Sequence, residues 1–427
     1  MKYIADLHIH SYYSRATSAE MTLEGVWRWA QLKGISVIGT GDFTHPGWFK
    51  EITEKLEPDE SGFLRLINPA QTHQIPEKCK LSINFVLTSE ISCIYSKKNA
   101  KTRKIHCIVI APDVASAAKI NLTLSKIGNL KSDGRPILGI DAKELLRIVL
   151  EVSDRALFVP AHAWTPHFSV FGAASGFDSL EECFEELTPH IHAIETGLSS
   201  DPPMNWRLSL LDNITLISNS DAHSPIKIGR EANIFDTALT YDEMLKAIKT
   251  KKGFLGTIEF FPEEGKYHFD GHRLCGICLS PKETIRYGYI CPKCKKKLTI
   301  GVMHRVLALA DRENGLKPNG AVDFKSIIPL NEIIAEVLNS NPTSKKVINE
   351  YYKMLTLLGN EFEILLEVPV EEIAITCGEK MAEAIKRMRH NNIHISPGYD
   401  GEYGKVRIFE DKNINKLNHI NGQLSLF

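Results

Sequence analysis

The chain has 427 residues, of which 43% are hydrophobic and 24% charged, and its formal net charge is −1. This composition is typical of a globular protein with a sizeable core, and the length predicts two or three domains. A chain so close to neutral has no overall electrostatic footprint for nucleic acid, so such a role must rest on a local basic patch.

Neither a membrane span nor a secretory signal is expected. The sequence holds no apolar run of the roughly eighteen residues that a membrane helix needs. The first residues, Met1 to Asp6, lack the charged and apolar regions of a signal peptide. We therefore expect a cytoplasmic, nucleoid-associated protein. Its nine cysteines are then expected to be reduced thiols or metal ligands.

Residues 1–262 alternate short apolar runs with helical patterns. Continuous apolar runs are typical of parallel strands covered on both faces, and they occupy residues 3–7, 35–39, 83–88, 105–110, 157–160, 191–194 and 214–218. A helix is predicted to start at Thr22 and to end at Gly34. Asp141 and Glu144 predict a capping box at the start of another helix. The alternation favours a (β/α) barrel, with an open doubly wound sheet as the alternative.

Candidate metal ligands follow these runs along the chain. They are His8, His10, Asp42, Glu90, His106, His162, Asp221 and His223. Residues two apart in a strand face the same side, so His8 and His10 can bind one ion or two adjacent ions, as can Asp221 and His223. Side chains at the C-terminal ends of parallel strands meet at one mouth.

The ligand types predict the chemistry. Imidazole and carboxylate together suit zinc, manganese or iron. A carboxylate such as Glu90 can bridge two ions, and paired ions activate water and clamp the oxygens of a phosphate. A single His near a strand end is usually structural, but this many potential ligands at successive strand ends predict a metal-dependent phosphoesterase.

A compositional change near residue 262 begins a second region. Cys275 with Cys278 and Cys291 with Cys294 form two knuckles, which predict a structural zinc ribbon over 263–300. Between Arg273 and Arg305 stand eight Lys or Arg and one acid. This patch favours a polyphosphate backbone as partner, with a merely solvated basic knuckle as the alternative. Tyrosines interleave with it, and the expected DNA-binding residues there are Tyr287, Lys293, Lys295 and Lys296.

The rest of the chain is predicted to be mostly helical. Residues 301–410 form an expected helical DNA-binding domain, with helices at 344–358 and 371–389 and a short strand at 405–409. The glycine-rich turn at 397–405 either packs against DNA or only joins helix to strand. Residues 411–427 are predicted to form a flexible tail, because much of this terminal segment is polar. Its residues 423–427 are similar to the pentapeptide by which bacterial DNA-processing proteins dock onto the replication sliding clamp, with Gln423, Leu424, Leu426 and Phe427 as contacts; the alternative is a terminal strand folded back onto the protein.

The motif DLHIH, the isolated Glu90, the later histidines and the motif SDAH resemble the polymerase and histidinol phosphatase (PHP) superfamily. The resemblance implies a distorted seven-stranded barrel with a trinuclear metal centre. One ion would be held by His8, His10, Glu90 and Asp221, a second by Glu90, His106 and His162, and a third with help from Asp42 and His223. Two departures affect the third ion: Ser14-Arg15-Ala16 replaces a further His, and Thr40-Gly41-Asp42 replaces Thr-Asp-His.

The order of barrel, ribbon, helical region and the segment PGYDGEYGKVRIF resembles the endonuclease Q family. This resemblance implies a DNA repair endonuclease that nicks 5′ to uracil, hypoxanthine, xanthine or an abasic site and leaves 3′-hydroxyl and 5′-phosphate ends. The damaged base would be flipped out of the stack. It also implies two or three barrel ions (Zn²⁺ or Mn²⁺, with Mg²⁺ or Fe²⁺ as alternatives) and one structural Zn²⁺.

The expected roles follow from this reading. Asp221, Glu90 and His223 are the expected catalytic residues, Arg15 is a candidate phosphate contact, and Trp164, Phe168 and Phe171 are candidates for the base pocket. Two alternatives stay open. A small-molecule phosphatase acting on a substrate such as histidinol phosphate explains the barrel but not the basic ribbon. A non-catalytic scaffold would use the metals structurally.

Overall fold

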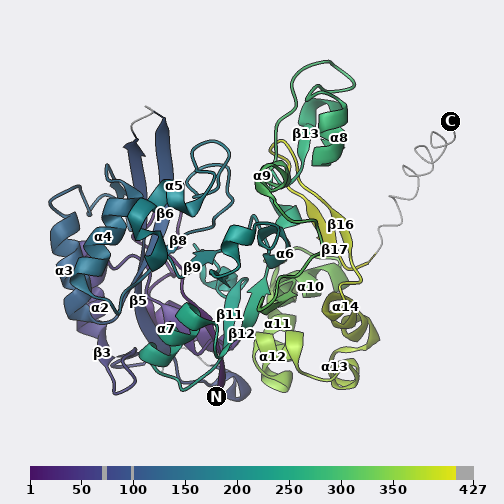
Figure 1. Cartoon of the computed structure of the whole chain (residues 1–427). Coiled ribbons are helices and arrows are strands. Elements are labelled where there is room, and N and C mark those ends of the chain that lie inside the picture. Colours follow the sequence, from purple (N-terminus) through teal and green to yellow (C-terminus); the bar gives the residue numbers. More distant parts are fainter. Residues whose placement is uncertain (70–74, 98–100, 410–427) are drawn as a thin grey trace.

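The computed structural model describes residues 1–69, 75–97 and 101–409 (Figure 1). The clamp-like segment 423–427 lies outside these residues. Among the described helices, none has the length and hydrophobicity that crossing a bilayer requires.

The central strands lie side by side in one sheet. Strand β1 (Lys2–Asp6) is parallel to β2 (Val37–Gly39), which is parallel to the long β5 (Asn84–Ser96). Beyond β5 follow β6 (Thr102–Ala111) and β8 (Leu157–Pro160). Together with β9 (Ala193–Glu195) and β10 (Thr215–Ile217), these strands confirm the seven predicted runs. Their bounds shift by a few residues, except that β5 continues well past its predicted end to Ser96.

The prediction that these strands are all parallel is wrong for part of the sheet. β5 pairs antiparallel with β6, and β6 pairs antiparallel with β8. Only five residues, 97–101, connect β5 to β6, and so short a connection permits a hairpin but no crossover. The apolar runs arise because both faces of these strands are buried, whatever their direction.

Several strands were not predicted from the sequence, and three of them extend the sheet beside β1. β11 (Ala232–Asp236) pairs antiparallel with β1, and β12 (Phe254–Glu259) pairs antiparallel with β11. β15 (Asp323–Ser326), from the second half of the chain, extends the sheet parallel to β12.

The hydrogen-bonded ladders of the described strands do not close into a ring. β9 and β10 form a parallel pair of their own, apart from the main sheet. A few hydrogen bonds, outside any regular ladder, cross the two gaps. Ala163 N donates to Glu195 O at 2.9 Å beside β8, and Asn233 Nδ2 donates to Ser218 O at 2.7 Å beside β11. The seven-stranded barrel therefore stays a prediction.

Helices of the first half begin and end where the sequence indicates. Helix α1 (Leu23–Lys33) starts at Thr22, whose hydroxyl accepts from Gly25 N, and ends at Gly34 with φ +89°. Asp141 caps α4 (Ala142–Val152) by accepting from Lys143 N. Glu144 does not complete a capping box there, because its carboxylate pairs with Arg147.

The remaining α-helices and strands complete the two halves of the chain. In the first half they are α2 (Pro46–Lys55), β3 (Leu56–Pro58), β4 (Leu64–Leu66), α3 (Val114–Leu124), β7 (Ile137–Leu138), α5 (Leu180–Phe184), α6 (Pro202–Asn205) and α7 (Tyr241–Thr250). In the second half they are β13 (Asp270–His272), β14 (Ile277–Leu279), α8 (Pro281–Arg286), α9 (Val302–Leu309), α10 (Leu330–Val337), α11 (Lys345–Leu358), α12 (Glu361–Leu366), α13 (Val370–Cys377), α14 (Glu379–Arg389), β16 (His394–Ser396) and β17 (Lys405–Arg407). Figure 1 shows β13 and α8 projecting away from both the sheet and the helices α10–α14.

The helical region confirms most of the predicted elements. α11 matches the predicted helix at 344–358, and β17 lies within the predicted strand at 405–409. The predicted helix at 371–389 is instead two helices, α13 and α14, separated by Gly378 with φ +90°. A buried ion pair, Lys33 Nζ to Glu361 Oε2 at 2.6 Å, joins α1 to α12 and ties this region to the sheet.

Candidate metal centre

One group of four side chains gathers where β1 ends. His8, His10, Glu90 and Asp221 each offer one ligand atom, and these atoms lie within 4.8 Å of one another. His10 Nε2 is 3.0 Å from Asp221 Oδ1 and 3.2 Å from Glu90 Oε2. The alternation of a strand explains why both histidines face the same side.

A second group lies on the other side of the same carboxylate. Glu90, His106 and His162 also place one ligand atom each within 4.8 Å of one another. His106 Nδ1 is 2.6 Å and His162 Nε2 is 3.0 Å from Glu90 Oε1. The register of β5 and β6 sets Glu90 opposite Ile108, so His106 is its diagonal neighbour on the same face. Glu90 thus turns Oε2 to the first group and Oε1 to the second, as a bridging carboxylate must.

The backbone is strained at the residues that carry this site. His162 has φ +29°, Asp221 φ +46° and Asp42 φ +48°. Non-glycine residues held in this region cost about 1–3 kcal/mol each, and such strain is concentrated at functional sites.

The donor atoms fit metal ions. Among the described residues, His8 Nε2, His10 Nε2 and Asp221 Oδ1 are buried side-chain atoms without a hydrogen-bond partner. Such orphaned atoms are costly unless something binds them. Burial lowers the pKa of His8 and His10, but the surrounding carboxylates outweigh it and hold both pKa values well above the usual range. The pocket thus favours a positive charge at the point where the ligand atoms converge.

Glu195 supports the first group from behind, a role that sequence reasoning missed. Its carboxylate accepts from His8 Nδ1 at 3.0 Å, from His162 N at 2.8 Å and from Asn219 Nδ2 at 2.9 Å. A carboxylate on the second ring nitrogen fixes the tautomer and orientation of a metal-binding histidine. The sequence offered one signal for this residue: Glu195 directly follows the predicted strand at 191–194, just as the predicted ligands follow other strands.

Asp42 has a similar supporting role for His10. Its Oδ1 accepts from His10 Nδ1 at 3.0 Å, while its Oδ2 accepts from Ser11 N, Ser11 Oγ and Ser14 Oγ at 2.7, 2.7 and 2.8 Å. Among the described residues, Asp42 and His223 belong to neither ligand group. His223 Nδ1 instead lies 2.9 Å from the backbone oxygen of Asp221.

Two arginines lie near the mouth. Arg135 Nη1 donates to Glu90 Oε2 at 2.9 Å, and this contact was not foreseen from the sequence. The predicted phosphate contact Arg15 is 85% exposed, with Nε 3.5 Å from Asp133 Oδ2.

A cavity of about 620 Å³ opens beside the second group. Its walls include His106, His162, Thr165, Phe168, Leu198, Ser199 and Asp221. The Phe168 ring lies 4.7 Å from the His106 ring. Trp164 and Phe171 pack against each other with their rings tilted, and both are fully buried. Of the three aromatic candidates for a base pocket, Phe168 alone lines this cavity.

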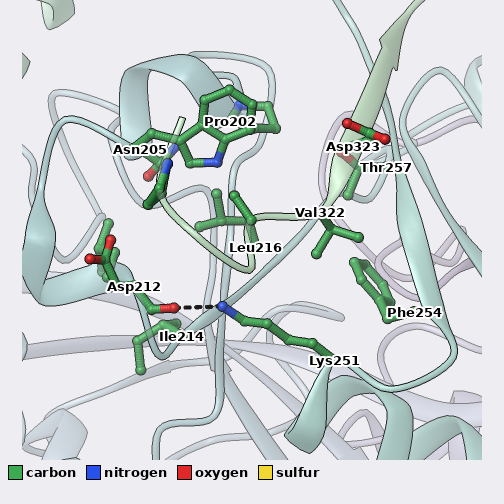
Figure 2. Close-up of a pocket in the computed structure, with 14 residues that line it drawn as sticks. Pro202, Asn205, Asp212, Ile214, Leu216, Lys251, Phe254, Thr257, Val322 and Asp323 are labelled. Atoms are coloured by element: carbon green, nitrogen blue, oxygen red, sulfur yellow. Dashed lines mark hydrogen bonds between the residues drawn. The ribbon is translucent and has the colours of Figure 1, made fainter. Parts of the chain in front are cut away.

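A separate cavity of about 440 Å³ lies between α6 and the strands β10, β12 and β15, and shares no residue with the ligand groups (Figure 2). Its main polar groups are already engaged. Lys251 Nζ donates to Asp212 O at 2.7 Å, and the Asp212 carboxylate accepts from Arg312 at 2.7 and 3.0 Å. The cavity therefore resembles a packing void more than a second active site.

The predicted ribbon brings three of its four cysteines together. Cys275, Cys291 and Cys294 place their sulfur atoms within 4.8 Å of one another and of a His272 nitrogen. Cys278 lies outside this group, with Sγ 4.0 Å from Pro397 O. In the β13–β14 hairpin Gly271 pairs with Cys278 and His272 with Ile277, so Cys278 and His272 point to opposite faces. The fourth cysteine ligand stays a prediction.

The basic side chains of the ribbon face solvent. Lys293, Lys295 and Lys296 are exposed, and Tyr287 is 51% exposed. Lys293 Nζ bonds only the backbone oxygen of Cys275, at 2.8 Å. No carboxylate among the described residues pairs with these three lysines, so their charge is available to a polyanion.

Comparisons with known proteins cover nearly all of the chain. The crystal structure of the lesion-specific endonuclease PfuEndoQ from Pyrococcus furiosus is 32% identical, with a TM-score of 0.83 over 98% of this chain and 99% of that chain. Endonuclease Q in complex with a 27-mer duplex carrying an abasic lesion at its active site is 32% identical, with a TM-score of 0.81 over 96% of this chain and 97% of that one.

Other relatives are uncharacterized. YqxK of Bacillus subtilis is 29% identical over 95% of this chain and 99% of its own length. MJ0043 of Methanocaldococcus jannaschii is 30% identical over 60% of this chain, and the match spans 33% of that longer protein. Residues 329–392, which hold α10–α14, match the family described as the MJ0043 C-terminal domain.

Proposed function

The chain belongs to the endonuclease Q family, and we propose that it is a DNA repair endonuclease that cuts a phosphodiester bond beside a damaged base. The observation that carries this proposal is Glu90, whose two oxygens face two different groups of potential ligands. A single carboxylate shared in this way can hold two ions side by side, and paired ions are one way in which phosphoesterases cleave phosphate esters.

The residues of the two groups would hold the ions. His8, His10, Glu90 and Asp221 fit one, and Glu90, His106 and His162 fit another. Zn²⁺ or Mn²⁺ suits these ligands best, with Mg²⁺ or Fe²⁺ as alternatives. Bound ions would supply an activated water and charge neutralisation at the phosphate. Glu195 and Asp42 would orient the histidines, and the burial of His8, His10 and Glu90 would keep bulk water from their side of the centre.

We assign substrate recognition to the surfaces around this centre. The cavity beside His106 and Phe168 would receive a nucleotide flipped from the duplex, because a base inside the stack cannot reach a concave site. The exposed lysines of the ribbon would grip the backbone, and a structural Zn²⁺ would fit its cysteines. Deaminated bases (uracil, hypoxanthine, xanthine) and abasic sites are the proposed lesions, with cleavage on the 5′ side to leave 3′-hydroxyl and 5′-phosphate ends.

Two further proposals complete this reading. The main sheet, whose hydrogen bonds do not close into a ring, would form a distorted seven-stranded barrel together with β9 and β10. These two strands would fill the gap between β8 and β11. Residues 423–427 would dock onto the replication sliding clamp through Leu426 and Phe427, because they pair an apolar anchor with a polar edge residue, Gln423.

One assay tests the central proposal. The purified protein is incubated with Mn²⁺ or Zn²⁺ and end-labelled duplexes that contain uracil, hypoxanthine, an abasic site or no lesion. We expect nicking only in the damaged strands, at the 5′ side of the lesion. Release of phosphate from a small monoester, without lesion-dependent nicking, would instead identify a small-molecule phosphatase. Absence of both activities in metal-loaded protein would favour a scaffold.

A further inference from the structure

We propose that Arg135 is a catalytic residue that contacts the scissile phosphate and supplies a fixed positive charge beside the two ligand groups. In this role the guanidinium replaces the contribution that a third ion would make. The inference rests on the proposed function, because it assigns a residue to that same reaction.

Asp42, a predicted ligand of a third ion, has no free oxygen to offer. Both oxygens of Asp42 accept hydrogen bonds, one from His10 and one from Ser11 and Ser14, and the side chain is fully buried. Across residues 1–69, 75–97 and 101–409, two groups of potential ligands occur at the sheet and neither includes Asp42 or His223. A third cation would have to break the bonds that hold His10 in place.

Arg135 is held rigidly next to the bridging carboxylate. The parallel pairing of β7 with β5 sets Ile137 opposite Ser92, and Ser92 N donates to Pro136 O at 3.0 Å. The same register, continued back by two residues, places Arg135 beside Glu90, where Nη1 donates to Oε2 at 2.9 Å. A side chain whose backbone is anchored to the strand that carries Glu90 keeps its geometry during the reaction.

The guanidinium retains donors for a substrate. Arginine carries five N–H donors in a planar fork that matches phosphate oxygens and stays charged at every working pH. Within the described part of the chain, Nη1 is the side-chain atom with a protein partner, and the side chain is 29% exposed. The other donors therefore have no partner among the described residues, and the guanidinium that carries them lies beside Glu90, which both ligand groups share. Negative charge grows on the phosphate in the transition state, so a preorganised cation there favours cleavage over binding.

The competing explanation is that Arg135 only neutralises Glu90. In that case its removal would disturb the ligands and reduce the amount of bound metal. If Arg135 contacts the phosphate, its removal would leave the metal in place and slow the chemical step.

The experiment compares Arg135→Gln, Arg135→Ala and a control, Arg155→Gln, in the full-length metal-loaded protein. Arg155 pairs with Asp242 at 2.8 Å and is 47% exposed, so the control removes an arginine ion pair at the surface, outside the ligand groups. Bound metal per chain is measured by mass spectrometry, binding of abasic duplex by fluorescence anisotropy, and cleavage under single-turnover conditions.

We expect Arg135→Gln to keep its metal content and to bind the duplex within a few-fold of wild type, while its cleavage rate falls about 100- to 1000-fold. Guanidinium chloride should partly restore cleavage by Arg135→Ala, relative to an equal concentration of sodium chloride. An unchanged cleavage rate, a loss of bound metal or an absence of rescue would each overturn the inference. If wild-type protein itself fails to nick damaged DNA, the proposed function fails instead.

Discussion

The carboxylate of Glu195 lies 3.0 Å from Nδ1 of His8, so the other ring nitrogen, Nε2, faces Glu90 and Asp221 at 3.6 and 3.7 Å. This relationship sets the tautomer that a metal ligand needs. It joins residues 187 positions apart in the sequence, and it leads to the first prediction.

Replacing Glu195 with Gln should weaken metal binding at the first ligand group by about 10- to 100-fold, because the amide no longer orients His8 as a carboxylate does. Isothermal titration of metal-free protein with Zn²⁺ measures the change. Glu186→Gln is the matched control, since Glu186 is exposed and bonds only surface residues. Equal affinities in the two variants would contradict the supporting role of Glu195.

Asp221→Asn should reduce nicking of abasic duplex by at least about 1000-fold, because a neutral amide replaces a charged ligand at the centre. Binding of the duplex should persist, since the ribbon lysines are untouched and Asn nearly matches the size of the one cavity-wall side chain that changes. Gel assays of nicking and anisotropy of binding separate the two effects. Asp242→Asn serves as a control, and a variant that loses binding but keeps its cleavage rate would refute the assignment.

Burial raises the pKa of Glu259 from its usual 4.5 to about 8, and nearby Asp201 adds to the rise, although hydroxyls from Thr257, Ser218 and Thr196 oppose it. At a pH between these two pKa values, the Glu259 carboxyl is protonated in the folded protein and ionised in the unfolded chain. Stability must then fall as pH rises, by about 1.4 kcal/mol per unit for one group.

The variant Glu259→Gln removes this titration while keeping the shape of the side chain. Its stability relative to wild type should therefore rise steadily between about pH 5 and 8, as measured by denaturant unfolding at several pH values. A stability difference that does not change with pH would show that Glu259 is ionised in the folded protein.

Removal of residues 423–427 should abolish binding to the replication sliding clamp and leave nicking of free DNA unchanged, because the segment is proposed to act only in docking. Pull-down with purified clamp measures the first effect. Ser425→Ala is the control, since Ser425 is not among the proposed anchors. Undiminished pull-down by the truncated protein would disprove the docking role.

The sequence by itself identified the members of the two groups of potential ligands. The pattern His8-Ile9-His10 and the motif with Asp221 are local, and strand alternation is enough to turn their side chains to one face. The same local rules located α1 through Thr22 and Gly34, and each of the seven predicted strands. These features depend on neighbours a few residues apart, which is why the sequence predicts them.

Only the tertiary structure decided how these residues are shared. The antiparallel pairing of β5 with β6 brings His106 to Glu90 and turns that carboxylate into a bridge between two groups. The bonds of Asp42 to Ser11 and Ser14 make it a support for His10, and the pairing of β7 with β5 brings Arg135 to Glu90. Such contacts join segments that are distant in the chain, and strand direction and register, which set them, are properties of the whole sheet.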